Sequence, residues 1–399
     1  MNAALEQHET PAGGRGLVGA DPHQATVSPL ELFFDLVFVF ALTQVTAFLA
    51  DDPTFAQLGR GLVLLAILWW AWSGYTWLTS TVDPELALPR LVMFAAMGAM
   101  LVVALATPGA FADDGVLWGV GYLAVRLLHA ALFALAARGD PALARAVLSL
   151  VASLIPGAGI IIVASAAFEG PTRDVLWVLA VVLDYGIVLG MGAEGWHVHA
   201  QHFAERFSLV ILIALGESIV AIGVGAEKIE LTGGVVLAAL VAVGIACAVW
   251  WTYFDVVAIV AEQRFRAAVG GDQVRMARDS YALLHLPMVS GIVLFALGTK
   301  KVMEHTGDPL KEMPAVALCG GLALYLLAHV AFRMRNVGSI GWPRIVAAAC
   351  CLALIPVALE AAGVVLLAML LAVFVTLVGF EVVHYAEARA RIRAERIGH

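Results

Sequence analysis

Two carboxylates stand inside long apolar segments of this chain. Asp35 lies in the stretch LFFDLVFVFALTQVTAFL, which runs from Leu32 to Leu49, and Glu217 lies in FSLVILIALGESIVAIG, which starts at Phe207. Apolar segments of this length predict membrane-spanning helices, because about 20 residues at ~1.5 Å rise cross a hydrocarbon core of about 30 Å. Since an ionised group at mid-bilayer costs roughly 2.5 to 3.5 kcal/mol, a carboxylate kept there is a candidate for a transport pathway or a proton relay.

Five polar residues are predicted to lie at similar depths in the membrane. Arg126 in the fourth predicted helix is roughly 15 Å from the outer surface at ~1.5 Å per residue, and Asp184 in the sixth is level with it. Glu217 and Gln44 occupy equivalent places in the seventh and first helices, and His129 shares the helix face of Arg126. We expect Arg126, His129, Asp184 and Glu217 to cluster, with Glu217 binding and releasing a proton or cation. The alternative is an ion pair that only pins helices together.

A second polar group is predicted at the inner ends of the first and seventh helices. Glu31 and Asp35 share a face near the start of the first helix, and Glu205 and Arg206 precede the apolar run of the seventh. We expect these residues to contribute to an inner gate, in which Asp35 meets a basic group from a neighbouring helix. The alternative is that the acidic residues only anchor the helix N-terminus, where the helix dipole favours negative charge.

The histidines and cysteines predict no metal site. His197, His199 and His202 form H-x-H-x-x-H, which is not a specific zinc pattern. His285 and His329 are expected to make interhelical hydrogen bonds rather than to relay protons. The four cysteines fall inside apolar stretches without C-x-x-C spacing, and no nucleotide-binding glycine motif is present. We therefore expect no metal, no cofactor and no nucleic-acid partner.

The composition defines the elements that must position these residues. Apolar residues make up 62% of the 399 residues and charged residues only 14%, with a mean hydropathy of +0.92. Such a chain is predicted to be an all-α polytopic membrane protein. Apolar runs and helix breakers predict twelve spans, at about 29–49, 55–79, 88–107, 115–138, 142–168, 174–196, 203–224, 231–258, 280–298, 313–332, 340–359 and 362–385.

Basic residues predict the orientation of these spans. Sixteen Lys and Arg residues fall on the side of the termini and six on the opposite side. By the positive-inside rule, both termini are expected in the cytoplasm, with the protein in the bacterial inner membrane. Residues 1–28 are rich in Gly, Ala and polar groups and are predicted to be a flexible cytoplasmic tail, while 387–399 form a basic cytoplasmic tail.

The chain also repeats itself. FDLVFVFALTQ from Phe34 matches FSLVILIALGE from Phe207, the Trp69–Trp70 pair recurs 181 residues later, and Leu-Ile-Pro at 154–156 recurs at 354–356. Two six-helix repeats, 29–198 and 199–386, are therefore predicted. Because six is even, they would share one orientation and be related by an axis along the membrane normal.

Two long motifs resemble a known family. SPLELFFDLVFVFALTQ from Ser28 and HFAERFSLVILIALGES from His202 are similar to the bacterial low temperature requirement A (LtrA) family, and the likeness extends over essentially all twelve spans. The resemblance implies a multi-spanning inner-membrane protein linked by name to growth in the cold, and it implies no settled biochemical activity.

A fainter resemblance concerns endolysosomal potassium channels with two six-helix repeats. Phe33, Phe34 and Asp35 resemble the F-S-D of their first helices, but Pro29 stands where those channels have an Arg. The second repeat departs further, with Arg206, Phe207 and Ser208 in place of the motif. This resemblance supports an ion channel as an alternative function.

The combined pattern favours a secondary transporter of a small solute or ion, with coupling to protons as an added expectation. Tandem repeats, buried ionisable groups and the lack of a nucleotide motif support this prediction. The alternatives are the ion channel, a membrane-embedded enzyme and a non-catalytic membrane organiser, and we expect the chain not to be an enzyme. The expected partners are membrane lipids and the solute, while a homo-oligomer is left open.

Overall fold

The computed structural model describes residues 26–190, 195–196, 198–227 and 229–397. Within these ranges every regular element is a helix, which confirms the predicted all-α fold. The predicted flexible tail, residues 1–28, lies almost entirely outside the described residues, and so does His197.

Six long helices make up the first part of the chain. They are α1 (Pro29–Asp51), α2 (Phe55–Thr79), α3 (Ala87–Ala106), α4 (Gly115–Ala136), α5 (Pro141–Ala167) and α6 (Gly170–Gly190). Local sequence sets the start of α1: the Ser28 hydroxyl accepts a hydrogen bond from the Glu31 N–H, the Glu31 side chain accepts one from the Ser28 N–H, and Pro29 occupies the first turn. This capping box fixes the end of the helix that carries Glu31 and Asp35.

The second part of the chain has more interrupted helices. Its elements are α7 (Ala200–Ala226), α8 (Gly233–Phe254), α9 (Val257–Ala267), α10 (Gly271–Met276), the π-helix η2 (Ala277–Leu283), α11 (His285–Glu304), α12 (Glu312–Ala315), the π-helix η3 (Val316–Gly320), α13 (Gly321–Val337), α14 (Trp342–Ala353), α15 (Ile355–Ala358), α16 (Gly363–His384) and α17 (Ala386–Ile397).

The helices are those of a polytopic membrane protein. Among the described residues, ten helical segments are long and apolar enough to cross a membrane. The two other predicted spans coincide with α6, which carries Arg173, Asp174 and Asp184, and with the broken pair α14–α15, an apolar segment of Trp342–Ala358. All twelve predicted ranges therefore correspond to helices, although the count of twelve crossings stays a prediction.

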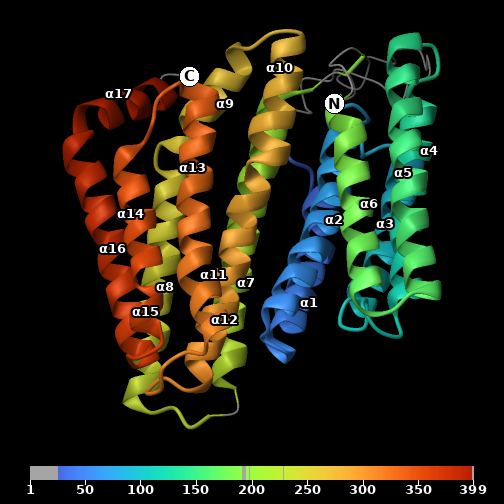
Figure 1. Cartoon of the computed structure of the whole chain (residues 1–399). Coiled ribbons are helices and arrows are strands. Elements are labelled where there is room, and N and C mark those ends of the chain that lie inside the picture. Colours follow the sequence, from blue (N-terminus) through green and yellow to red (C-terminus); the bar gives the residue numbers. More distant parts are fainter. Residues whose placement is uncertain (1–25, 191–194, 197, 228, 398–399) are drawn as a thin grey trace, which may run out of the picture.

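The long helices run up and down in one bundle, so that α1 begins and α17 lies at the same end, the upper end in Figure 1. α11 lies at the centre, where it packs against α7, α13 and α1. Close contact between α11 and α13 depends on Gly291 and Gly321, since a Cβ added to Gly291 would lie 2.5 Å from the Gly321 carbonyl oxygen. Small residues thus bring these two backbones together.

The predicted basic tail at 387–399 is helical over most of its length. α17 turns away from α16 at the upper end of the bundle (Figure 1). It is held there by Arg389, which pairs with Asp255 at 2.6 Å and lies over the Trp251 ring at 5.9 Å from its centroid. The C-terminal segment therefore packs on the bundle through α8.

Candidate functional site

The inner ends of α1 and α7 are joined by a buried ion-pair cluster, the Arg206 cluster, formed by Glu31, Asp35, His202 and Arg206. Arg206 donates to Glu31 at 2.7 Å and to Asp35 at 2.5 Å, and its side chain is fully buried. His202 contacts Glu31 at 3.0 Å. The expectation that Asp35 meets a basic group from a neighbouring helix is confirmed, and the partner is Arg206.

A ring of polar contacts from α2 completes this cluster. The Trp72 indole N–H donates to Asp35 at 2.8 Å, and Arg206 donates to the Thr79 hydroxyl at 3.3 Å. The Arg206 guanidinium also lies 5.8 Å from the Trp72 ring centroid. One cation with two carboxylates, each hydrogen-bonded further, is the arrangement in which buried charges are tolerated, and it locks α1, α2 and α7 together.

Glu205, the fourth residue of the predicted gate, lies outside the Arg206 cluster. Its carboxylate accepts a hydrogen bond from the Val27 N–H at 3.3 Å. It therefore faces the segment that leads into α1, whereas Arg206 on the next position points into the bundle.

A second buried ion pair joins α4 to α6. Arg126 donates to both carboxylate oxygens of Asp184, at 2.8 and 3.1 Å, and the Tyr122 hydroxyl donates to the same carboxylate at 2.9 Å. The two parallel hydrogen bonds give a bidentate pair, which fixes orientation as well as charge. The predicted proximity of Arg126 and Asp184 is confirmed.

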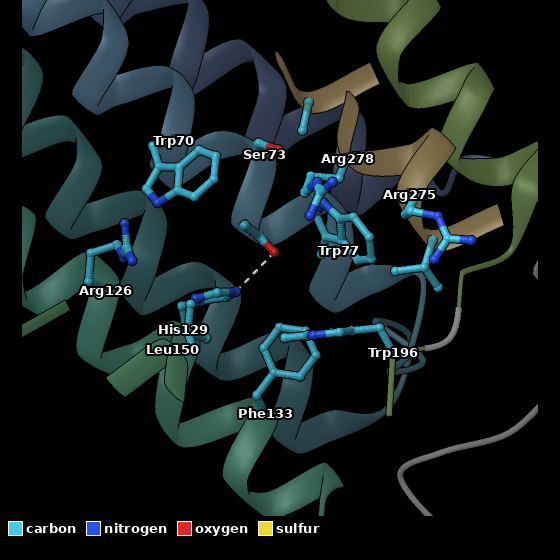
Figure 2. Close-up of a pocket in the computed structure, with 13 residues that line it drawn as sticks. Trp70, Ser73, Trp77, Arg126, His129, Phe133, Leu150, Trp196, Arg275 and Arg278 are labelled. Atoms are coloured by element: carbon cyan, nitrogen blue, oxygen red, sulfur yellow. Dashed lines mark hydrogen bonds between the residues drawn. The ribbon is translucent and has the colours of Figure 1, made fainter. Parts of the chain in front are cut away.

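His129 lies one turn after Arg126 on the same helix. Its Nε2 is 2.9 Å from the Gly74 carbonyl oxygen of α2, the hydrogen bond that the dashed line in Figure 2 marks. A Cβ added to Gly74 would come within 3.0 Å of the His129 ring, so the glycine makes room for this contact. His129 therefore belongs to the same region as Arg126.

The expectation that Glu217 joins this cluster is wrong. Its buried carboxylate accepts a hydrogen bond from the Thr43 hydroxyl of α1 at 2.6 Å, whereas Arg126 is taken up by Asp184. Gln44, the residue next to Thr43, is half-buried. Depth along a helix predicted similar levels, but Glu217 faces α1 rather than α4 or α6.

A cavity of about 90 Å³, cavity 1, opens beside Arg126 and His129 (Figure 2). It lies between α2, α4 and α5, and α10 and η2 contribute to one wall. Its lining residues are Trp70, Ser73, Gly74, Trp77, Arg126, His129, Phe133, Leu150, Trp196, Val274, Arg275, Arg278 and Ala282. The lining combines aromatic rings with three arginines and carries no carboxylate, so it favours a small ligand with an apolar body and an acidic group.

A second cavity of about 260 Å³, cavity 2, lies among α8, α9, α13, α14, α16 and α17. Arg344 and Glu381 line it and form a bidentate pair at 2.8 and 3.0 Å. Arg344 also lies 2.7 Å from His329 Nδ1. This contact agrees with the expectation that His329 makes an interhelical hydrogen bond, as does the hydrogen bond between His285 and Tyr253 at 2.9 Å.

Several residues of these sites were not singled out from the sequence. Trp72 and Thr43 supply hydrogen bonds to buried carboxylates, and Arg278 and Gly74 line cavity 1. The glycine offered a faint signal, because a small residue inside a helix marks close approach of a neighbour. Within the described part of the chain, no group of three or more His, Cys, Asp or Glu side chains is arranged to hold a metal ion.

The fold and its buried ion pairs define the chain as a helical, multi-pass membrane protein with a cavity inside the bundle. The chain belongs to the bacterial low temperature requirement A protein (LtrA) family, whose model matches residues 26–379. It is also similar to the uncharacterized protein RA0937 of Rhizobium meliloti (strain 1021), with 32% identity over 318 residues, or 76% of each chain. The predicted family is confirmed.

Proposed function

We propose that this protein is a secondary transporter that moves a small solute together with a proton. The observation that carries the proposal is cavity 1, which lies beside a buried ion pair in the membrane-spanning part of the bundle. Ionisable groups kept at such positions are typical of substrate and proton pathways. The proposal assigns no catalytic activity to the chain.

We further propose that the two halves, 29–198 and 199–386, are repeats in one orientation. Trp72 donates to Asp35 between α1 and α2, and Tyr253 lies 3.4 Å from Ser208 between α8 and α7. The two pairs are separated by 181 and 173 residues, the same spacings that align the apolar motifs. α3 packs on α1 and α4, just as α11 packs on α7 and α13.

The two cavities support the same proposal. Trp70 and Phe133 line cavity 1, while Trp251 and Phe332, their counterparts in the aligned motifs, line cavity 2. Each cavity also holds one Arg–carboxylate pair that reaches the last helix of its half. Alternating access in transporters built from repeats arises from movement of one half against the other.

The proposed setting is the bacterial inner membrane, with the upper end of Figure 1 in the cytoplasm. Basic residues concentrate on that side, as the positive-inside rule requires. Exposed leucines such as Leu91, Leu105 and Leu240 would contact lipid tails around the bundle. A homo-oligomer through one of these faces is compatible with the proposal.

Flux measurements test this function. The full chain is reconstituted in vesicles that enclose a pH-sensitive dye, and small carboxylates, amino acids, sugars and inorganic ions are added in turn under an imposed pH gradient. We expect one class to drive proton movement that saturates with solute concentration and is absent from protein-free vesicles. Non-saturating proton or ion flow would support a channel instead, and no flux with any class would contradict transport.

Glu217 is the proposed proton-exchanging group on the α1 side. Glu217→Gln keeps size and hydrogen-bonding capacity toward Thr43 and removes the charge, so we expect normal insertion with loss of pH-dependent flux. The matched control is Glu262→Gln, the same change on a partly exposed carboxylate of α9. Normal pH-dependent flux in a stable Glu217→Gln protein would rule out this role.

A further inference from the structure

We propose that cavity 1 binds a short-chain carboxylic acid together with its proton, held between Arg126 and His129. The proposal rests on the transport function above, because it names the chemical class of the solute and the place of its proton. It is carried by two buried polar atoms, Arg126 Nε and His129 Nδ1, that have no hydrogen-bond partner. Both residues line cavity 1.

The hydrogen bond to Gly74 determines what His129 offers. A carbonyl oxygen can only accept, so His129 Nε2, at 2.9 Å from the Gly74 oxygen, must carry a hydrogen. In the neutral ring, Nδ1 is then a hydrogen-bond acceptor with a free lone pair. A buried acceptor without a donor is uncommon in proteins and points to a group that supplies one.

Arg126 offers the complementary atom. Its Nη1 and Nη2 atoms donate to Asp184 and Tyr122, which leaves the Nε–H as the free donor. Arg126 and His129 are three residues apart on α4 and therefore share a face. One donor and one acceptor are presented side by side along this face.

A protonated carboxyl group satisfies both atoms. Its carbonyl oxygen accepts from Arg126 Nε–H, and its O–H donates to His129 Nδ1. A bare carboxylate has no hydrogen to offer and would place its second oxygen against the Nδ1 lone pair. Binding from neutral solution therefore takes up one carboxylate and one proton, with the proton resting on the ligand or on Nδ1, and release returns both.

The walls of cavity 1 determine the rest of the ligand. Trp70, Trp77, Phe133 and Trp196 supply aromatic surface, and Leu150 adds an aliphatic wall. About 90 Å³ accommodates several non-hydrogen atoms, since one water needs about 10–15 Å³ in such a measure. A short aliphatic chain fits this space and these surfaces.

The charged groups that surround His129 are consistent with this assignment. Arg126 on α4 is neutralised by Asp184 on α6, and Tyr75 of α2 and Tyr185 of α6 are the neighbouring phenols. On the side of α10 and η2, Arg278 pairs with Asp279, and Arg275 pairs with Asp272. Since each arginine has a carboxylate partner, the cavity favours a neutral acid over a free anion.

Binding of butyrate to the full-length protein in nanodiscs tests the proposal. Calorimetry at pH 5.5, 6.5 and 7.5 should show a Kd that rises about tenfold per pH unit, because a carboxylic acid of pKa near that of a Glu side chain is protonated in proportion to the proton concentration. Titrations in buffers of different ionisation enthalpy should give about one proton taken up per butyrate. A Kd independent of pH, or tighter binding of inorganic phosphate, would overturn it.

His129→Gln isolates the acceptor atom, because the Gln amide N–H can still donate to Gly74 while Nδ1 is lost. We expect at least tenfold weaker butyrate binding and no proton uptake. The matched control, His329→Gln, makes the same change in the other half and should bind as the wild type does. Unchanged binding in folded His129→Gln would contradict the assignment, and the proton count on wild-type protein tests it without any variant.

The two proposals fail separately. Proton-linked butyrate binding without saturable flux in vesicles would remove the transport function and leave the site. Saturable flux of another solute class without butyrate binding would keep transport and overturn the carboxylic acid site.

Discussion

Buried charge is the main feature of this protein at the scale of the residue. Arg206 satisfies two carboxylates, Glu31 and Asp35, whereas Arg126 satisfies only Asp184 and keeps an unused donor. A cation saturated by two acids has little capacity left for a ligand. The Arg206 cluster is therefore best suited to holding helices, and the region of Arg126 and His129 to binding.

Replacing Arg206 by Ala would strand two buried carboxylates. We expect Arg206→Ala to lower the free energy of unfolding by about 3–5 kcal/mol, the usual consequence of removing one partner of a buried pair. Arg266→Ala, which breaks an exposed pair with Glu262, should change it by about 0.5 kcal/mol or less. Denaturation of the purified proteins in mixed micelles measures both. Equal stability of the two variants would show that the cluster is not structural.

Gly74 sets the distance between α2 and His129. A Cβ at this position would lie 3.0 Å from the ring carbon Cε1 and 3.2 Å from Nε2, so Gly74→Ala must displace the ring. We expect a loss of about 1 kcal/mol in stability and weaker butyrate binding. Gly59→Ala lies on the same helix with nothing within 4 Å, and it should stabilise slightly or have no effect. Thermal unfolding compares them, and equal melting temperatures would contradict the close contact.

At the scale of the element, close helix packing depends on small residues. Gly291 of α11 faces the backbone of α13, with an added Cβ only 2.5 Å from the Gly321 carbonyl oxygen. Because a backbone oxygen cannot turn aside as a side chain can, Gly291→Ala must separate the helices. The central position of α11 makes this contact important for the whole second half.

We expect Gly291→Ala to destabilise the protein by about 1–3 kcal/mol, the usual cost of overpacking. Gly223→Ala on α7 meets no neighbouring atom and should be neutral or gain up to about 1 kcal/mol from helix propensity. Denaturation in mixed micelles distinguishes the two. A Gly291→Ala protein as stable as wild type would mean that α11 and α13 are less tightly packed.

Helix interruptions also have a role at this scale. The π-helix η2 precedes α11 and lines cavity 1 through Arg278 and Ala282. The Trp69 indole N–H donates to the Ala282 carbonyl oxygen at 2.6 Å, so the first half directly contacts this irregular turn. π-helical turns frequently occur at functional sites, and this one joins the two halves beside the cavity.

At the scale of the whole molecule, the direction of insertion can be measured directly. Reporters that are active only outside the cytoplasm, fused near Ala112, Glu169 and Thr306, should be active, because these positions lie between helices on the side with few basic residues. A fusion after His399 should be inactive. The reverse pattern would contradict both the orientation and the even number of crossings.

Polar partners were predictable only where two constraints coincided. Arg126 and Asp184 have opposite charge and similar depth, and they pair. Glu217 has the same depth but a different direction around its helix axis, and it faces Thr43. Sequence spacing gives depth along a helix, while the angle between neighbouring helices comes from their packing.

The sequence by itself determined the family, the membrane class and the positions of the helices, because hydrocarbon thickness imposes a length on every apolar segment. Only the tertiary structure decided which helices are neighbours, and hence that Arg206 joins Glu31 and Asp35 while His129 lies beside a cavity. The physical reason is that apolar helix surfaces are chemically alike, so the partners of buried polar groups depend on close packing of side chains and not on hydrophobicity.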